Sequence, residues 1–167
     1  MNKGVALANG TWINFMNSGD LFFNRDVIKS LISYFFKADM VYGNHAIYET
    51  VPASFSIVDA KQKKSNDIPY CHQALFEKKE YLIKYPFDLN YKISSDYDHY
   101  LKCKNDNINI CFVPILVVKF LDGGLSSIDT KRLLKDNFNV AKKYFKYCAI
   151  YTYLKRLLKF YVTKALK

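Results

Sequence analysis

Two acidic positions lie in surroundings that suit chemistry on phosphates or hydroxyl groups, and Asp20 is the first of them. It ends the turn Asn17–Asp20, which follows the short apolar run Trp12–Met16. A carboxylate at a strand end lies where α/β sheets present ligands, and it can hold Mg²⁺ or Mn²⁺ against a diphosphate. The same residues are also an ordinary surface turn. Taken alone, the turn leaves both interpretations open.

The second position is Asp96, which follows Ser94 and Ser95, two residues able to cap a helix. Acids in the first turn of a helix are favoured by its dipole, which is the structural interpretation. The functional interpretation makes Asp96 a general base that takes up the proton of an attacking hydroxyl. Asp98, two residues further along the helix, points in another direction, and we expect it to be structural.

Two weaker motifs accompany these acids. His72 and Gln73 precede the apolar run Ala74–Phe76, although a lone histidine is more often a structural group than a ligand. Gly123 and Gly124 form a turn whose backbone N–H groups could bind a phosphate, as could those of many ordinary turns.

The elements that would position these residues alternate between helix and strand. Helices are predicted up to Ala8, from Asn24 or Asp26 to about Phe35, over 79–84, and from Ser94 or Ser95 to about Lys104. Strands are predicted over 12–16, 40–42, 47–48, 74–76 and 111–118, with a polar loop at 59–69. Mixed elements in a chain of this length indicate one layered α/β domain.

The net charge of +10 belongs to the C-terminal segment. Residues 131–167 hold 11 of the 25 Lys and Arg residues against the single acid Asp136, and the remaining charges cancel. Apolar residues recur there at helical spacing, so we expect a basic, aromatic, amphipathic tail. Either the tail packs on the domain, or it lies on anionic lipid. No recognised nucleic-acid motif accompanies the charge, so we expect no nucleic-acid partner.

The cysteines and the apolar runs indicate in which cellular compartment the protein is found. The four cysteines show no C-x-x-C pair and no zinc-like spacing with the histidines, and we expect buried, reduced thiols. The longest apolar run, 110–118, is too short to span a membrane, and no signal pattern is seen. We expect a cytoplasmic protein, peripheral at the inner face of the plasma membrane.

The order of the motifs resembles one enzyme family. The segments are Met1–Gly4, Gly10–Asp20, Val41–Gly43, Cys71–Gln73, Ser95–Asp98 and Gly123–Ser126. Together they resemble family-2 glycosyltransferases of the GT-A fold, in the bacterial branch that builds surface polysaccharides. The resemblance covers residues 1–127 and implies a partial, Rossmann-like GT-A domain with an incomplete mixed sheet, followed by helices over 128–167.

The resemblance also implies residue roles. Asp20 would be the metal ligand and Asp96 the catalytic base. Asn17, Ser18, His72, Gln73, Gly123 and Gly124 would line the donor site. Asn17 stands where many relatives place the first acid of a D-x-D-type motif, which makes Asp20 the main protein ligand of Mn²⁺ or Mg²⁺.

A further implication concerns the start of the chain. In the family, a segment like Met1–Gly4 follows strands that grip the nucleotide, so we expect those strands to be absent and little transfer by these residues alone. A truncated reading frame, a mis-called start and a separately encoded N-terminal half stay open as explanations.

The expected activity is an inverting, metal-dependent hexosyl transfer. A nucleotide-diphosphate sugar would be the donor, and a glycan or lipid-linked acceptor of surface polysaccharide synthesis would receive the sugar. The alternative is a non-catalytic membrane-surface or assembly protein that retains the remnant of the fold.

Overall fold

The computed structural model describes residues 1–50, 53–60, 67–121, 123 and 129–145, with the single positions 150, 151, 153, 154, 157, 158 and 161. The chain forms two compact units. The first comprises Met1–Phe87 and Lys102–Asp122, and the second comprises Asp88–Leu101 and Gly123–Lys167. The expected division into 1–127 and 128–167 stays a prediction.

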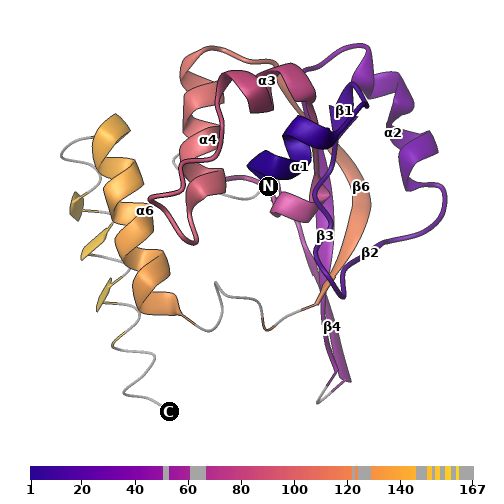
Figure 1. Ribbon diagram of the computed structural model, residues 1–167. Helices are drawn as coiled ribbons and strands as arrows, with labels where there is room; N and C mark the ends of the chain where they lie inside the picture. The colour runs from indigo at the N-terminus through magenta and orange to yellow at the C-terminus, as the bar shows by residue number, and fades with distance from the viewer. Residues whose placement is uncertain are drawn as a thin grey trace. The chain divides into compact units, whose positions relative to one another are not determined.

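The first unit is built around a mixed, six-stranded sheet (Figure 1). Its strands are β1 (Trp12–Ile13), β2 (Leu21–Phe22), β3 (Met40–Thr50), β4 (Ala53–Val58), β5 (Leu75–Lys78) and β6 (Ile110–Leu121). The order is β1-β5-β3-β6-β2, with β4 paired to β3. The neighbours β3 and β6 are parallel and the other pairs are antiparallel. The predicted α/β class with a mixed, partial Rossmann-like sheet is confirmed.

Strand β3 differs from the sequence-based expectation of two short strands separated by Gly43 and Asn44. It is a single strand whose register against β6 shifts around these two residues. A Cβ atom on Gly43 would lie 2.6 Å from the carbonyl oxygen of Ile115 and 2.6 Å from Cγ2 of Val117. The glycine therefore marks a close approach of two strands at an irregularity, and the strand continues through it.

Three helices of the first unit pack around this sheet. They are α1 (Asn2–Leu7), α2 (Val27–Phe35) and α3 (Lys79–Lys84), all close to the predicted bounds. Helix α2 buries Val27 and Leu31 in a core with residues of β3, β5 and β6 and of their connections. This core contains Val27, Leu31, Ala38, Val41, Ala74, Phe76, Val113, Val117 and Val118. A second cluster joins α1 to α3 through Val5, Leu82 and Phe87.

Strand β4 was missed by the sequence analysis. It pairs with the second half of β3, and its residues alternate between small polar and apolar types in the period of a strand. Phe55 and Ile57 are 55% and 60% exposed. The sheet therefore has an exposed apolar edge strand at this end.

The second unit contains helix α6 (Thr130–Phe145) and the first part of helix α4 (Ser95–Asn105). The division between the units falls within α4, after Leu101. Helix α6 buries Leu134, Asp136 and Val140. Beyond it, the described positions from 150 to 161 are helical. Among the helices that the structure describes, none combines the length and apolar composition of a membrane span.

Candidate functional site

Asp20 lies at the junction of a turn and strand β2. The turn is closed by a hydrogen bond from the Asp20 amide to the Asn17 carbonyl oxygen at 3.1 Å. Gly19 has φ +91°, a left-handed conformation that glycine adopts without steric cost. Asp20 is buried, whereas Asn17 and Ser18 are exposed. The predicted turn is confirmed, and it turns the acid inward.

Both carboxylate oxygens of Asp20 accept hydrogen bonds. Oδ1 accepts one from the backbone N–H of Leu121 at 2.9 Å, and Oδ2 accepts one from Nε2 of Gln73 at 2.8 Å. Leu121 ends β6, and Gln73 lies on the 3-10 turn η2 (His72–Ala74) that leads into β5. The structure therefore brings together two predicted site residues that are 53 positions apart.

Gln73 is held in one orientation by its other neighbours. The Cys71 thiol donates to Oε1 of Gln73 at 2.8 Å, so the amide nitrogen faces Asp20. Nδ2 of Asn14 donates to the carbonyl oxygens of Gln73 and Leu75, at 2.8 Å each. Asn14 and Cys71 lie in the segments Gly10–Asp20 and Cys71–Gln73 but were not predicted as site residues, because no pattern within either segment signals these contacts.

His72 packs with aromatic rings. Its imidazole stacks on Phe15 with ring centroids 5.2 Å apart, and Phe87 lies edge-on to it at 5.8 Å. The aromatic packing sets the plane of the ring, and the ring is half-buried. The expected donor-site role of His72 stays a prediction.

Of the two predicted glycine positions, Gly123 is exposed and has φ +104°. No atom lies within 4 Å of the place where its Cβ would be, so backbone conformation, and not space, favours glycine there. Gly124 lies outside the described residues.

Asp96 belongs to the second unit and lies in the first turn of α4. It is half-buried, and its Oδ1 accepts a hydrogen bond from the Tyr97 amide at 2.8 Å. Asp98 is fully buried and pairs with Lys143, whose Nζ lies 3.2 Å from its Oδ1. This position fits the structural role expected of Asp98.

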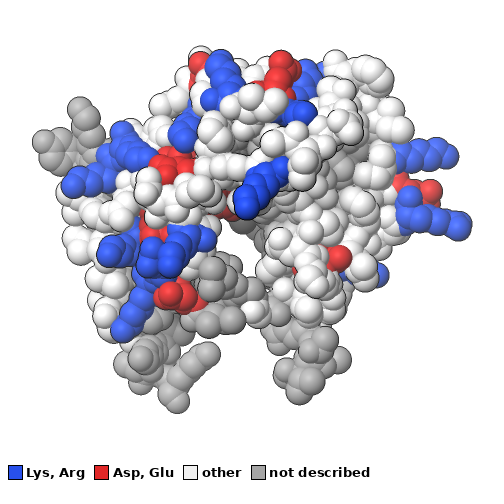
Figure 2. Space-filling view, viewed as in Figure 1, with Lys and Arg blue, Asp and Glu red and all other residues white. Residues whose placement is uncertain are grey.

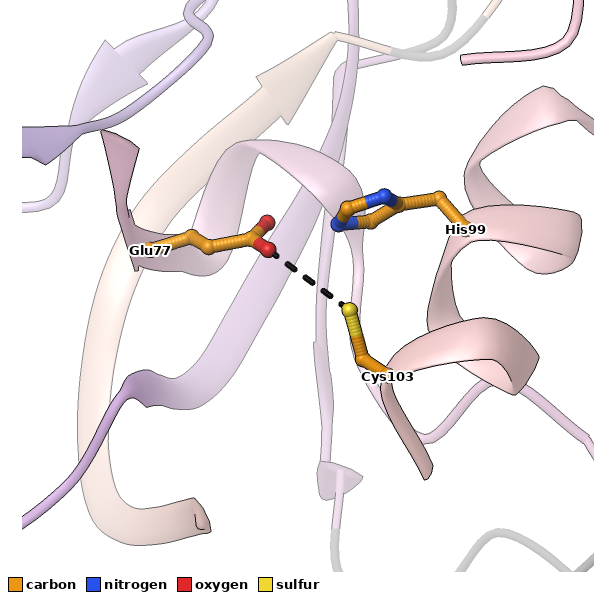
Figure 3. Close-up of side chains that lie close together, drawn as sticks. All are labelled: Glu77, His99 and Cys103. Carbon is orange, nitrogen blue, oxygen red and sulfur yellow. Dashed lines mark hydrogen bonds between the residues drawn. The ribbon is translucent and has the colours of Figure 1, made fainter. Parts of the chain in front are cut away.

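A second group of polar side chains involves α4 and β5 (Figure 3). The Cys103 thiol donates to Oε1 of Glu77 at 3.8 Å, and both residues are buried. Burial, and then the Glu77 carboxylate, raises the pKa of this thiol, so it is neutral at physiological pH. His99 lies one helical turn before Cys103 on α4. Imidazole, thiol and carboxylate are donors of transition-metal sites, so these residues are a possible metal-binding triad.

The sequence analysis did not predict this triad. Its signal was the spacing of four between His99 and Cys103, which places two donors on the same side of a helix. The contribution of Glu77 depends on pairing between distant segments and could not be seen in the sequence.

Asp20 is compatible with a hard divalent cation, although it is not part of the triad. A carboxylate has about four lone-pair sites, and two are occupied by the bonds from Leu121 and Gln73. Mg²⁺ is commonly bound through one or two carboxylates together with substrate phosphates and water. A single buried carboxylate at a strand end therefore suits a cation whose other ligands come from a diphosphate.

The described fold is similar to that of a protein of known structure. The chain superposes on the crystal structure of S. aureus TarS residues 1–349 in complex with UDP, with a TM-score of 0.57. The sequences are 12% identical, and the match covers 84% of this chain and 42% of TarS. No family model matches the sequence.

Curated relatives of this chain are named glycosyltransferases. A PGL/p-HBAD biosynthesis glycosyltransferase of Mycobacterium bovis (strain BCG / Pasteur 1173P2) is 29% identical over 145 residues. The glycosyltransferase Rv2957 of Mycobacterium tuberculosis (strain ATCC 25618 / H37Rv) matches equally well. The matches cover 81% of this chain and 55% of each relative, so the chain spans about half the length of these relatives.

Proposed function

We propose that this chain contributes to a metal-dependent, inverting hexosyltransferase of bacterial surface polysaccharide synthesis. The donor would be a nucleotide-diphosphate sugar, and the acceptor a glycan or a lipid-linked sugar. The observation that carries the proposal is the buried Asp20 carboxylate, held by Gln73 and by the end of β6. The fold and the names of the relatives support it.

Asp20 and Gln73 would act on the donor side. In this proposal Asp20 holds Mn²⁺ or Mg²⁺, which supplies charge stabilisation for the departing nucleoside diphosphate. Gln73 and the Leu121 amide keep the carboxylate in one orientation, so it need not reorganise when the donor binds. Asn17, Ser18, His72 and the glycines at 123 and 124 complete the proposed donor site.

Asp96 would act on the acceptor. The hydroxyl oxygen attacks the anomeric carbon, the bond between that carbon and the diphosphate oxygen breaks, and the hydroxyl proton passes to the Asp96 carboxylate. Attack from the face opposite the leaving group inverts the anomeric centre. A carboxylate is suited to this step because the hydroxyl becomes more acidic as it attacks, and the carboxylate can then accept its proton.

The proposal is tested by separating donor binding from transfer. Donor binding is measured on this chain extended with the nucleotide-binding strands of a GT-A enzyme. Calorimetric titration of UDP-sugars with Mn²⁺ should show binding that disappears with EDTA and weakens at least tenfold in Asp20→Asn. Transfer is measured on the same extended chain. There, Asp96→Asn should abolish turnover and leave donor binding unchanged.

Asp26→Asn is the matched control, because Asp26 is exposed and makes no side-chain cap bond to α2. It should alter neither binding nor transfer. Near-normal turnover of Asp96→Asn would reject the base assignment. Metal-independent donor binding would reject the role of Asp20.

A non-catalytic membrane-surface or assembly protein is the second candidate. It is favoured by the exposed apolar side chains of Tyr151, Leu154, Leu158 and Tyr161 in the basic tail. The same surface would also suit the enzyme, since attachment to anionic lipid at the inner face of the plasma membrane would bring it near a lipid-linked acceptor.

A further inference from the structure

Helix α6 is joined to the segment before α4 by a buried acid. Asp136 is 3% exposed and lies on the buried side of α6 with Leu134 and Val140. Its Oδ2 accepts a hydrogen bond from the backbone N–H of Ile93 at 3.2 Å, and Nε of Arg132 lies 3.4 Å from its Oδ1. The only acidic residue of the basic tail therefore holds the backbone two residues before α4 begins.

A second contact is made two turns further along α6. Nζ of Lys143 lies 3.2 Å from Oδ1 of Asp98 and 3.6 Å from Oδ2 of Asp88. It also lies 4.6 Å from the ring centroid of Tyr91. The hydroxyl of Tyr144 donates to Oδ1 of Asp98 at 3.4 Å. Both ends of the segment 88–98 are thus bound to the same helix.

The protonation states suit these contacts. Burial lowers the pKa of Lys143, but the bonds with Tyr91 and Asp98 raise it more, so Lys143 stays a cation. Burial, and then the charge of Asp98, raises the pKa of Tyr144 to about 12, so its hydroxyl keeps the proton that it donates. These two partners of Asp98 remain donors throughout the physiological range.

The burial of Asp98 distinguishes this pair from a surface salt bridge. Lys143 is 45% exposed at its side chain, whereas Asp98 is fully buried. Exposed pairs contribute little to stability. Removing one partner of a buried carboxylate leaves a charge without compensation, while removing both is much better tolerated. The contact therefore constrains the geometry of this segment strongly.

We propose that Lys143 and Asp136 are positioning residues for Asp96. They hold residues 88–98 on α6, and Asp96 lies within this segment, between Ser95 and Tyr97 at the start of α4. A misplacement of about 1 Å at a reacting group can lower a rate about a hundredfold. The inference rests on the proposed function for the role of Asp96. Helix α6, the first part of the basic tail, would then help to place the base that acts on the acceptor.

Amide hydrogen exchange tests the physical part on the chain as it exists. Lys143→Met should accelerate exchange of the amides of residues 93–98 at least tenfold. Lys142→Met, which changes the exposed neighbouring lysine, should leave it unchanged. Lys143→Arg should preserve protection, and combining Lys143→Met with Asp98→Asn should recover part of any lost melting temperature. Equal exchange in the two methionine variants would overturn the inference.

Turnover tests the positioning part on the extended chain. Lys143→Met should lower kcat at least tenfold with the donor KM within twofold of the unmodified value, and Lys143→Arg should retain most of kcat. Faster exchange at 93–98 with an unchanged kcat would overturn the positioning role. If the extended chain without substitutions transferred no sugar from any nucleotide sugar tested, the proposed function would fail, and exchange would still decide whether α6 holds this segment.

Discussion

At the scale of single residues, the Asp20–Gln73 contact connects structure to the proposed chemistry. Gln73 can serve Asp20 only because it presents its nitrogen, and the Cys71 thiol on its oxygen ensures that orientation. The side-chain amide of Gln73 is uncharged, so its hydrogen bond does not cancel the charge of the Asp20 carboxylate. That carboxylate can still attract a cation. A carboxylate in place of Gln73 would change both stability and cation binding.

Gln73→Glu is therefore expected to lower the free energy of unfolding at pH 7 by about 1–3 kcal/mol, because it places a second buried carboxylate against that of Asp20. The loss should shrink as pH falls, because two carboxylates in contact can share one proton. Mn²⁺ should stabilise this variant more than the unmodified protein, because two carboxylates then face the ion. Thermal and urea melts with and without Mn²⁺ measure these changes.

Gln73→Met is the matched control for this prediction. It removes the hydrogen bond to Asp20 without adding a charge, so its loss of stability should depend on pH less steeply than that of Gln73→Glu. Mn²⁺ should not stabilise it more than it stabilises the unmodified protein. If the two variants behave alike, charge repulsion at Asp20 is not the cause.

At the scale of elements, the contact between β3 and β6 depends on the absence of one side chain. The β6 segment opposite Gly43 contains Pro114 and Ile115, which lie between the residues paired with Gly43 and Asn44. Proline cannot donate to a sheet ladder, and such an irregularity is where a strand tolerates it. The two strands then approach so closely that only glycine fits.

Gly43→Ala is expected to destabilise the protein by about 1–3 kcal/mol, because the new Cβ would meet backbone that cannot rotate away. Gly4→Ala is the matched control. Gly4 lies in α1, and no atom lies within 4 Å of the place where its Cβ would be, so the change should be neutral or slightly stabilising. Urea denaturation of both variants checks the difference, and equal stabilities would contradict the close approach.

At the scale of the whole molecule, the basic tail has two parts with different surroundings. Helix α6 packs through buried residues against the segment 88–98. Figure 2 shows basic side chains over α6, on the left of the view. Further along, Tyr151, Leu154 and Leu158 are 70%, 56% and 67% exposed at spacings of three and four. The packed and the lipid-bound interpretations therefore suit different parts of the tail.

We expect the chain to sediment with vesicles that contain anionic lipid, less so as salt rises, and not with neutral vesicles. Each basic residue near such a surface contributes about 1 kcal/mol, and apolar insertion adds to this. The double variant Leu154→Glu with Leu158→Glu should abolish sedimentation.

Leu89→Glu is the control for the vesicle experiment, because Leu89 is 82% exposed but lies outside the tail. It should sediment as the unmodified chain does. If the double variant still binds vesicles fully, the apolar residues of the tail do not contact lipid.

The sequence by itself determined features that depend on neighbouring residues. Helix α2 follows from apolar spacing of three and four, and the end of α3 follows from Pro86 shortly after it. The turn at Asn17–Asp20 follows from its composition. The mixed α/β class follows from the alternation of such elements, because each of these signals is carried by residues within a few positions of one another.

Only the tertiary structure decided how distant segments meet. The contact of Asp20 with Gln73 spans 53 positions, and that of Ile93 with Asp136 spans 43. Strand β4 and the continuity of β3 through Gly43 likewise depend on which strands pair. Periodicity shows which side of an element is apolar, but it does not select the partner. That choice depends on burial and hydrogen bonding summed over the whole fold.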